Sequence, residues 1–176
     1  MNFAKYGIIN AKKYPAKEYL VEVRPPKQRR SLTWKEFNEE TNKVANYLKN
    51  EVGVQKGDFV LHLQMNSLEW VVTFHAALRV GAAIVPLSFR FAETDILYAA
   101  QACNPKAFIF DERFLPRIEP IMKDISSIKS YICIGEQVPE GMISYADVIR
   151  SGDPRDILVD VDKDDPAELM FTSGTT

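Results

Sequence analysis

The sequence has few cysteines, few histidines and almost no net charge. It carries two cysteines, two histidines and a formal net charge of −2 over 176 residues. Cys103 and Cys133 lie in apolar stretches without the spacing of metal ligands, so we expect buried, reduced thiols rather than a disulfide or a zinc site. The near-neutral charge gives no electrostatic reason to expect a nucleic-acid partner.

Long apolar segments are also lacking. The start of the chain has no apolar core of a signal peptide, and the most apolar helical stretch, near Trp70 to Val80, is interrupted by Thr73, His75 and Arg79. We therefore expect no membrane span and take the cytoplasm as the default compartment. A hydrophobic share of 46% and a charged share of 26% are typical of a globular domain with a core.

The hydrophobic pattern divides the chain into four parts. Residues 1–33 predict a helix and a hairpin, and residues 34–150 predict an α/β core. Residues 151–166 predict a polar surface connection, and residues 167–176 a last strand followed by a turn. Short apolar runs alternate with helical patterns in the core, which predicts a largely parallel sheet with helices on both faces.

The expected strands of the core are 59–63, 83–87, 107–110 and 131–134, and the last strand is 168–171. The expected helices are 2–13, 34–52, 66–80, 93–102, 113–123 and 145–150. Thr33 and Glu36 form a capping box before the second of these helices. Asn66 and Glu69 suggest a similar start for the third.

Ligands of such sheets bind outside the carboxyl ends of the strands. Asp111 and Glu112 follow one strand end and either face a ligand or cap the next helix. His62 and His75 lie in apolar elements, so we expect them to be core histidines. No Ser/His/Asp or Cys/His catalytic arrangement is recognisable. Two basic clusters either bind phosphate or lie in solvent: Lys12, Lys13 and Lys17, and Lys27, Arg29 and Arg30.

The most informative feature is the hydroxyl-rich run Thr172-Ser173-Gly174-Thr175-Thr176, which follows an apolar strand. Glycine lets the backbone approach an oxyanion closely, and successive amides in a turn can surround an anion. The Gly-x-x-x-x-Gly-Lys pattern of other phosphate loops occurs nowhere in the chain. Composition alone leaves two interpretations open, a phosphate-binding turn and a frayed polar end.

Several motifs together resemble the adenylate-forming superfamily, which includes acyl-CoA synthetases, aryl-CoA ligases, luciferases and peptide-synthetase adenylation domains. TSGTT resembles the opening of the family's phosphate loop, which continues with glycine, a variable residue, proline and lysine. Three earlier blocks resemble family signatures in the same order: LTWKEFNEETNKVANYL at 32–48, GVQKGDFVLHLQMNSLEWV at 53–71 and LRVGAAIVPLSFRF at 78–91. The last block is more similar to CoA ligases than to peptide-synthetase domains.

This resemblance implies an AMP-forming carboxylate–CoA ligase. In such enzymes a fatty or aromatic acid attacks ATP with Mg²⁺ on the phosphates, and coenzyme A then displaces AMP from the acyl-adenylate. By position, Thr172, Ser173, Gly174, Thr175 and Thr176 would hold the β- and γ-phosphates of ATP. Arg90 would lie near the phosphates of coenzyme A, unless it is only a surface arginine.

The resemblance also implies an enzyme several hundred residues longer than this chain. The family's loop lysine and C-terminal catalytic lysine would follow Thr176, so we expect the 176 residues alone to be inactive and no catalytic residue or metal ligand among them. An uncovered apolar face would favour self-association. Two alternatives stay open: a non-catalytic α/β interaction module, and an adenylation domain that loads a carrier-protein thiol.

Overall fold

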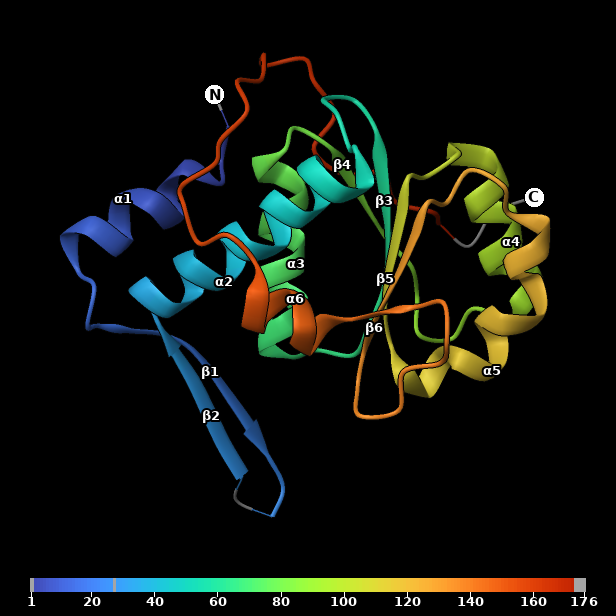
Figure 1. Ribbon diagram of the computed structural model, residues 1–176, viewed down its shortest axis with the longest axis horizontal. Coiled ribbons are helices and arrows are strands. Elements are labelled where there is room, and N and C mark those ends of the chain that lie inside the picture. Colours follow the sequence, from blue (N-terminus) through green and yellow to red (C-terminus); the bar gives the residue numbers. More distant parts are fainter. Residues whose placement is uncertain (1, 27, 173–176) are drawn as a thin grey trace.

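A computed structural model describes residues 2–26 and 28–172 of the chain. Its centre is a five-stranded sheet in the order β4-β3-β5-β6-β7, and every neighbouring pair is parallel. The strands are β3 (Phe59–Leu63), β4 (Ala83–Pro86), β5 (Ala107–Asp111), β6 (Ser130–Ile134) and β7 (Ile143–Ser144). Helices lie on both faces of this sheet (Figure 1), which confirms the α/β class predicted from the sequence.

A helix and a hairpin precede the sheet, as predicted. The helix is α1 (Lys5–Lys13), which starts three residues later than expected, and the antiparallel hairpin consists of β1 (Glu18–Arg24) and β2 (Gln28–Thr33). The hairpin projects away from the rest of the molecule (Figure 1). Tyr19 at its base stacks on Trp34 with ring centroids 3.5 Å apart, which fixes the hairpin to the helix that follows.

The first face of the sheet is covered by α2 (Trp34–Tyr47), α3 (Leu68–Arg79) and α6 (Tyr145–Ser151). The predicted capping box opens α2, because Thr33 accepts from the Glu36 amide while the Glu36 carboxylate accepts from the Thr33 amide. After α2 the chain continues as a π-helical turn, η1 (Leu48–Val52). The helix ends at Gly53, which has a φ of 78°. A left-handed residue of this kind is least strained when it is glycine.

The second face is covered by α4 (Glu93–Cys103) and by a helical segment in three pieces. The pieces are η2 (Glu112–Phe114), α5 (Leu115–Ile118) and η3 (Glu119–Asp124). The sequence predicted one helix over 113–123. Pro116 and Pro120 remove two amide donors from it, so the segment alternates between α and 3₁₀ geometry.

The strands are buried on both sides, as expected for a parallel sheet between two helical layers. Val60 and Ile109 pack against the first layer, whereas Leu61 and Phe108 pack against the second, and all four side chains are fully buried. The alternation follows from the two-residue period of a strand. It explains why these strands read as continuous apolar runs in the sequence.

The end of the described chain differs from the expected strand over 168–171. Only one parallel bridge forms, between Glu168 and Ile84, with Ile84 N–Ala167 O at 3.1 Å and Leu169 N–Ile84 O at 2.9 Å. The next residue of β4 on this edge is Pro86, which has no amide hydrogen to continue the ladder. The segment therefore follows β4 without becoming a full strand.

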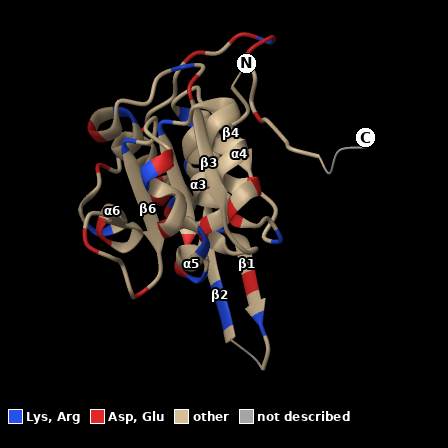
Figure 2. Cartoon of the chain, turned by 90° about the vertical axis from the view of Figure 1, so that its right-hand side faces the viewer, with Lys and Arg blue, Asp and Glu red and all other residues tan. Residues whose placement is uncertain are grey.

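A connection without named helices or strands leads from α6 to this bridge. It crosses α2 and α3 and passes near the N-terminal end of the chain, and its acidic and basic residues are visible in Figure 2. Cys103 and Cys133 are free and buried, as predicted, and burial raises the pKa of both thiols to about 11. Over residues 2–26 and 28–172, no helix is both long and apolar enough to cross a membrane.

Candidate functional site

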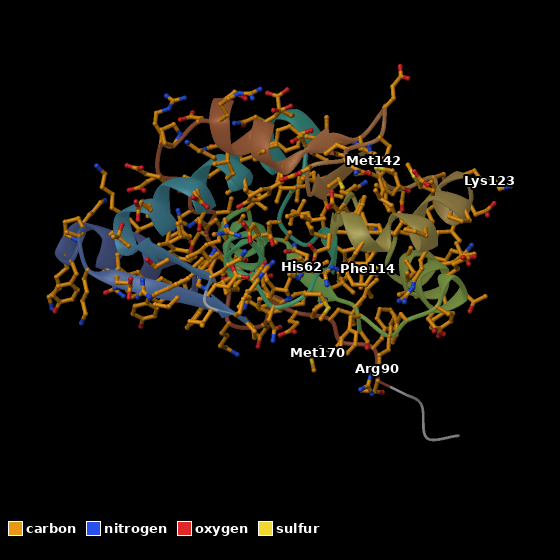
Figure 3. The ribbon with its side chains drawn as sticks, turned by 90° about the horizontal axis from the view of Figure 1, so that it is seen from below. His62, Arg90, Phe114, Lys123, Met142 and Met170 are labelled. Atoms are coloured by element: carbon orange, nitrogen blue, oxygen red, sulfur yellow. The ribbon has the colours of Figure 1, made fainter. Side chains whose placement is uncertain are left out.

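All strands of the sheet are parallel, so their carboxyl ends share one edge of the molecule. Figure 3 views the molecule from this side. Three features lie at this edge. They are the last described segment beside β4, the turn that carries Arg90, and a group of carboxylates that follow β5 and β6 in the chain.

The last segment runs toward the carboxyl end of β4, because its bridge to Ile84 is parallel. Phe171 contacts Tyr98 of α4, with ring centroids 6.1 Å apart, and Thr172 is exposed. The segment thus brings Thr172, the first residue of the hydroxyl-rich run, toward the edge where ligands of such sheets bind. Ser173, Gly174, Thr175 and Thr176 lie outside the described residues.

Arg90 lies on the turn that directly follows β4. The Leu87 amide donates to His62 O at 2.8 Å, and the Phe91 amide donates to Ser88 O at 2.9 Å, which closes the turn. The Arg90 guanidinium lies over the Phe89 ring, 5.4 Å from its centroid. It is exposed and has no carboxylate partner within the described part of the chain. Figure 3 labels Arg90 and Met170 on the same side of the molecule.

Asp111 and Glu112 cap no helix with their side chains; they connect strand ends instead. Asp111 Oδ2 accepts from the Met65 amide at 2.8 Å, just after β3. Glu112 Oε2 accepts from the amides of Glu136 and Gln137 at 2.7 and 2.9 Å, just after β6. Both carboxylates also line a cavity of about 470 Å³ between the hairpin, α3 and α6. Their bonds fix the carboxyl edge through one oxygen of each carboxylate.

The cap of α3 lies one residue later than the sequence suggested. Ser67 Oγ accepts from the Trp70 amide at 3.1 Å, whereas Asn66 is exposed. Glu69 binds Arg30 of the hairpin in an ion pair. Burial favours the neutral form of Glu69, but the hydrogen bond and charge of Arg30 outweigh it and lower the pKa of this carboxyl.

Both histidines are buried in the core, as predicted. His62 Nε2 lies 2.8 Å from the Thr73 hydroxyl, and burial lowers the pKa of His62 to about 3. His75 packs against Phe3 and Phe37, and burial lowers its pKa to about 4. Both rings are therefore neutral at physiological pH, and neither faces the candidate edge with a charge.

Three of the five described residues of the basic clusters pair with carboxylates, and Lys13 and Lys17 lie over the Tyr14 ring, which favours the solvent-exposed interpretation. Lys12 pairs with Asp156 at 3.2 Å, and Arg29 pairs with Glu18 at 2.5 Å. Arg30 pairs with Glu69 and also lies 3.5 Å from Glu22. Lys27 lies outside the described residues.

The sequence did not reveal the buried cation Arg79, which is fully inaccessible. Its guanidinium donates to the side-chain oxygens of Asn38 and Asn42. The amide nitrogens of the same two side chains donate to Asp156 Oδ1, at 2.9 and 3.0 Å. Two amides thus bridge a cation and a carboxylate, and they attach the connection to α2. Burial lowers the pKa of Arg79 to about 10. The sequence offered one signal: Asn38 and Asn42 are four residues apart, which places their side chains on the same face of a helix.

Among known protein families, the model described as AMP-binding enzyme matches residues 9–176 of the chain. The chain belongs to this family. The match bears out the resemblance carried by TSGTT and the three earlier blocks.

Individual relatives are CoA ligases and acyl-CoA synthetases. The chain is 26% identical over 144 residues to the mitochondrial acyl-coenzyme A synthetase ACSM5 of Rattus norvegicus. The match covers 82% of this chain and 25% of that protein. Among solved structures, it resembles the anthranilate CoA ligase AuaEII in complex with anthranoyl-AMP, with TM-score 0.91 and 28% identity over 100% of this chain and 33% of that one. The Mycobacterium tuberculosis fatty acyl CoA synthetase gives TM-score 0.84 and 25% identity over 98% and 32%.

These proteins are much longer than the chain, which spans about a quarter of the length of the curated relatives it matches. Within the described residues, no group of three or more His, Cys, Asp or Glu side chains could hold a metal ion.

Proposed function

We propose that the protein containing this chain is an AMP-forming carboxylate–CoA ligase. It joins a fatty or aromatic acid to AMP with release of pyrophosphate, and then transfers the acyl group to the thiol of coenzyme A. Family membership supports the adenylate-forming chemistry. The named relatives, which include an acyl-CoA synthetase and an anthranilate CoA ligase, support coenzyme A as the acceptor and either acid class as substrate.

One structural observation carries the proposal. The parallel bridge between Glu168 and Ile84 directs the last described segment toward the carboxyl end of β4, and Thr172, the first residue of the hydroxyl-rich run, is exposed. A run of amides and hydroxyls at this place suits a polyphosphate, because ligands of parallel sheets bind at this edge. We therefore assign the β- and γ-phosphates of ATP to Thr172, Ser173, Gly174, Thr175 and Thr176.

The chemistry requires stabilisation of negative charge. In the first step charge builds up on the phosphate oxygens, and aimed amide and hydroxyl donors are the form of catalysis that lowers such a barrier. Mg²⁺ would neutralise part of that charge. The described residues offer no carboxylate cluster for the ion, so we assign it mainly to the phosphates of the nucleotide.

We assign Arg90 to the phosphates of coenzyme A. Its guanidinium is exposed and has no carboxylate partner among the described residues. Arg90 lies just after β4, the strand that the last segment joins. An arginine with these properties can bind phosphate oxygens with two donors at once.

We also propose that the chain divides after residues 33, 150 and 166 and that the protein is cytoplasmic. Residues 1–176 alone would be inactive. The exposed side chains Tyr98 (67%) and Met170 (64%) lie around the last segment and would favour self-association of the isolated chain.

The test is carboxylate-dependent exchange of pyrophosphate into ATP, measured on the full-length protein with a panel of fatty and aromatic acids. We expect exchange with at least one acid. Thr175→Val should lower it by about 10²-fold, the usual cost of removing one oxyanion donor. Thr94→Val, which changes an exposed threonine at the start of α4, is the matched control and should leave it unchanged within about twofold.

The outcomes separate the alternatives. No exchange with any acid would favour the non-catalytic interaction module. Exchange followed by transfer to a carrier-protein thiol, but not to coenzyme A, would favour the carrier-loading adenylation domain.

A further inference from the structure

The turn that carries Arg90 is held by a second arginine from a distant part of the chain. Arg117 of α5 donates from Nη1 to Phe89 O at 2.8 Å and to Phe91 O at 3.1 Å. The two carbonyls belong to the residues on either side of Arg90. Hydrogen bonds from a charged donor are stronger than neutral ones, so this contact restrains the backbone at the position that sets the direction of the Arg90 side chain.

Arg117 is itself well supported. Its guanidinium lies 5.7 Å from the centroid of the Phe114 ring, and that ring is buried in the second layer. Ile118, the next residue of α5, is fully buried and anchors the short helix. Figure 3 labels Phe114 and Arg90, which belong to the two segments that this contact joins.

The turn has only modest restraints of its own. Apart from Arg117, it is closed by the bond from the Phe91 amide to Ser88 O, and the Arg90 amide lies 3.3 Å from Ser88 Oγ. Phe89 and Arg90 are both exposed and pack mainly on each other. Phe91 at the end of the turn packs against the buried residues of the second layer, so the two bonds from Arg117 add a restraint mainly on the exposed residues Phe89 and Arg90.

We propose that Arg117 is a positioning residue, which holds the Ser88–Phe91 turn so that the Arg90 guanidinium meets the phosphates of coenzyme A. The inference rests on the proposed function, since it requires that Arg90 binds this substrate. Arg117 acts through Arg90 and uses its own donors on backbone carbonyls. Loss of Arg117 should therefore affect recognition of the phosphate-bearing part of the thiol substrate and not the activation of the acid.

The experiment compares two thiols in the full-length protein. Arg117→Met replaces the aliphatic part of the side chain with one of similar length and removes its donors. With coenzyme A as acceptor, we expect the KM of the variant to rise at least about threefold, the lower range of couplings between residues in contact. With pantetheine, which has no phosphate, the variant and the wild type should give the same KM. Lys123→Met is the matched control, because it removes an exposed cation from the neighbouring η3 and has no contact with the turn (Figure 3).

A double-mutant cycle with Arg90→Gln tests whether Arg117 acts through Arg90. If it does, adding Arg117→Met to Arg90→Gln changes the KM for coenzyme A by less than about twofold, whereas independent roles would multiply the two effects. An equal loss with both thiols, or an unchanged KM for coenzyme A, would overturn the inference.

Pyrophosphate exchange separates this failure from failure of the proposed function. If the wild type shows no acid-dependent exchange, the ligase assignment fails and the inference fails with it. If exchange is present and Arg117→Met does not change the preference for coenzyme A over pantetheine, only the inference about Arg117 is wrong.

Discussion

Replacement of Asn42 by leucine should strongly destabilise the fold, because Asn42 is fully buried between a cation and the connection. Its side-chain oxygen accepts from Arg79 and from the Ile157 amide, and its nitrogen donates to Pro154 O at 2.9 Å and to Asp156 Oδ1. A lost hydrogen bond to a buried charge costs about 1.5–3 kcal/mol, and the weaker bonds to the connection add about 1 kcal/mol. We therefore expect a loss of about 3 kcal/mol.

Urea unfolding measures this loss, with the fluorescence of Trp34 and Trp70 as the signal. With a dependence on urea of about 2 kcal/mol per molar, a loss of about 3 kcal/mol lowers the midpoint by roughly 1.5 M. The matched control is Asn46→Leu, one turn along α2. Asn46 donates only to Asp153 O and Arg155 O, both at 3.0 Å, so its replacement should cost only about 1 kcal/mol.

A double variant decides whether the lost hydrogen bond to the Arg79 charge is the cause. Arg79→Met removes the cation, so Asn42→Leu should cost clearly less in that background than in the wild type. Equal costs in both backgrounds, or a cost of Asn42→Leu no larger than that of Asn46→Leu, would show that the bond to Arg79 does not cause the loss.

Three further predictions concern other parts of the molecule. In Gly135→Ala the new Cβ would lie 2.1 Å from the Glu112 carboxylate, so the strand-end bonds should break and the Tm should fall by several degrees, about 1–2 kcal/mol, in calorimetry. Burial raises the pKa of Glu40 to about 6, above its ordinary value of 4.5, so the stabilisation present below pH 4.5 is lost as the pH rises through 6. Glu40→Gln should therefore raise the urea midpoint at pH 7 and not at pH 4, and an equal change at both would contradict this. Cys103 and Cys133, with thiol pKa values of about 11, should react with iodoacetamide at pH 8 only after unfolding, and rapid native labelling would disprove their burial.

Much of the fold could be predicted because its signals are local. The strand at Phe59–Leu63 has the predicted limits, and the capping box of Thr33 and Glu36 is present. Where two polar neighbours compete, the sequence could not choose between them, and Ser67 rather than Asn66 caps α3. Each of these outcomes depends on residues that are close together in the sequence.

Features that depend on distant partners could not be predicted. Arg79 is acceptable in the core because Asn38 and Asn42 of α2 accept from it and connect it to Asp156. The bonds of Arg117 to the turn span 26 and 28 positions, and no periodicity reports such a contact. At the candidate site, motif resemblance therefore named Arg90 but not the residue that holds its turn.

The most direct test is a structure of the full-length protein with Mg²⁺ and a non-hydrolysable ATP analogue. We expect β- and γ-phosphate oxygens within about 3.2 Å of amide nitrogens or hydroxyls of residues 172–176, beyond the carboxyl end of β4. A polyphosphate bound elsewhere, or a turn whose amides are buried against protein, would contradict this expectation.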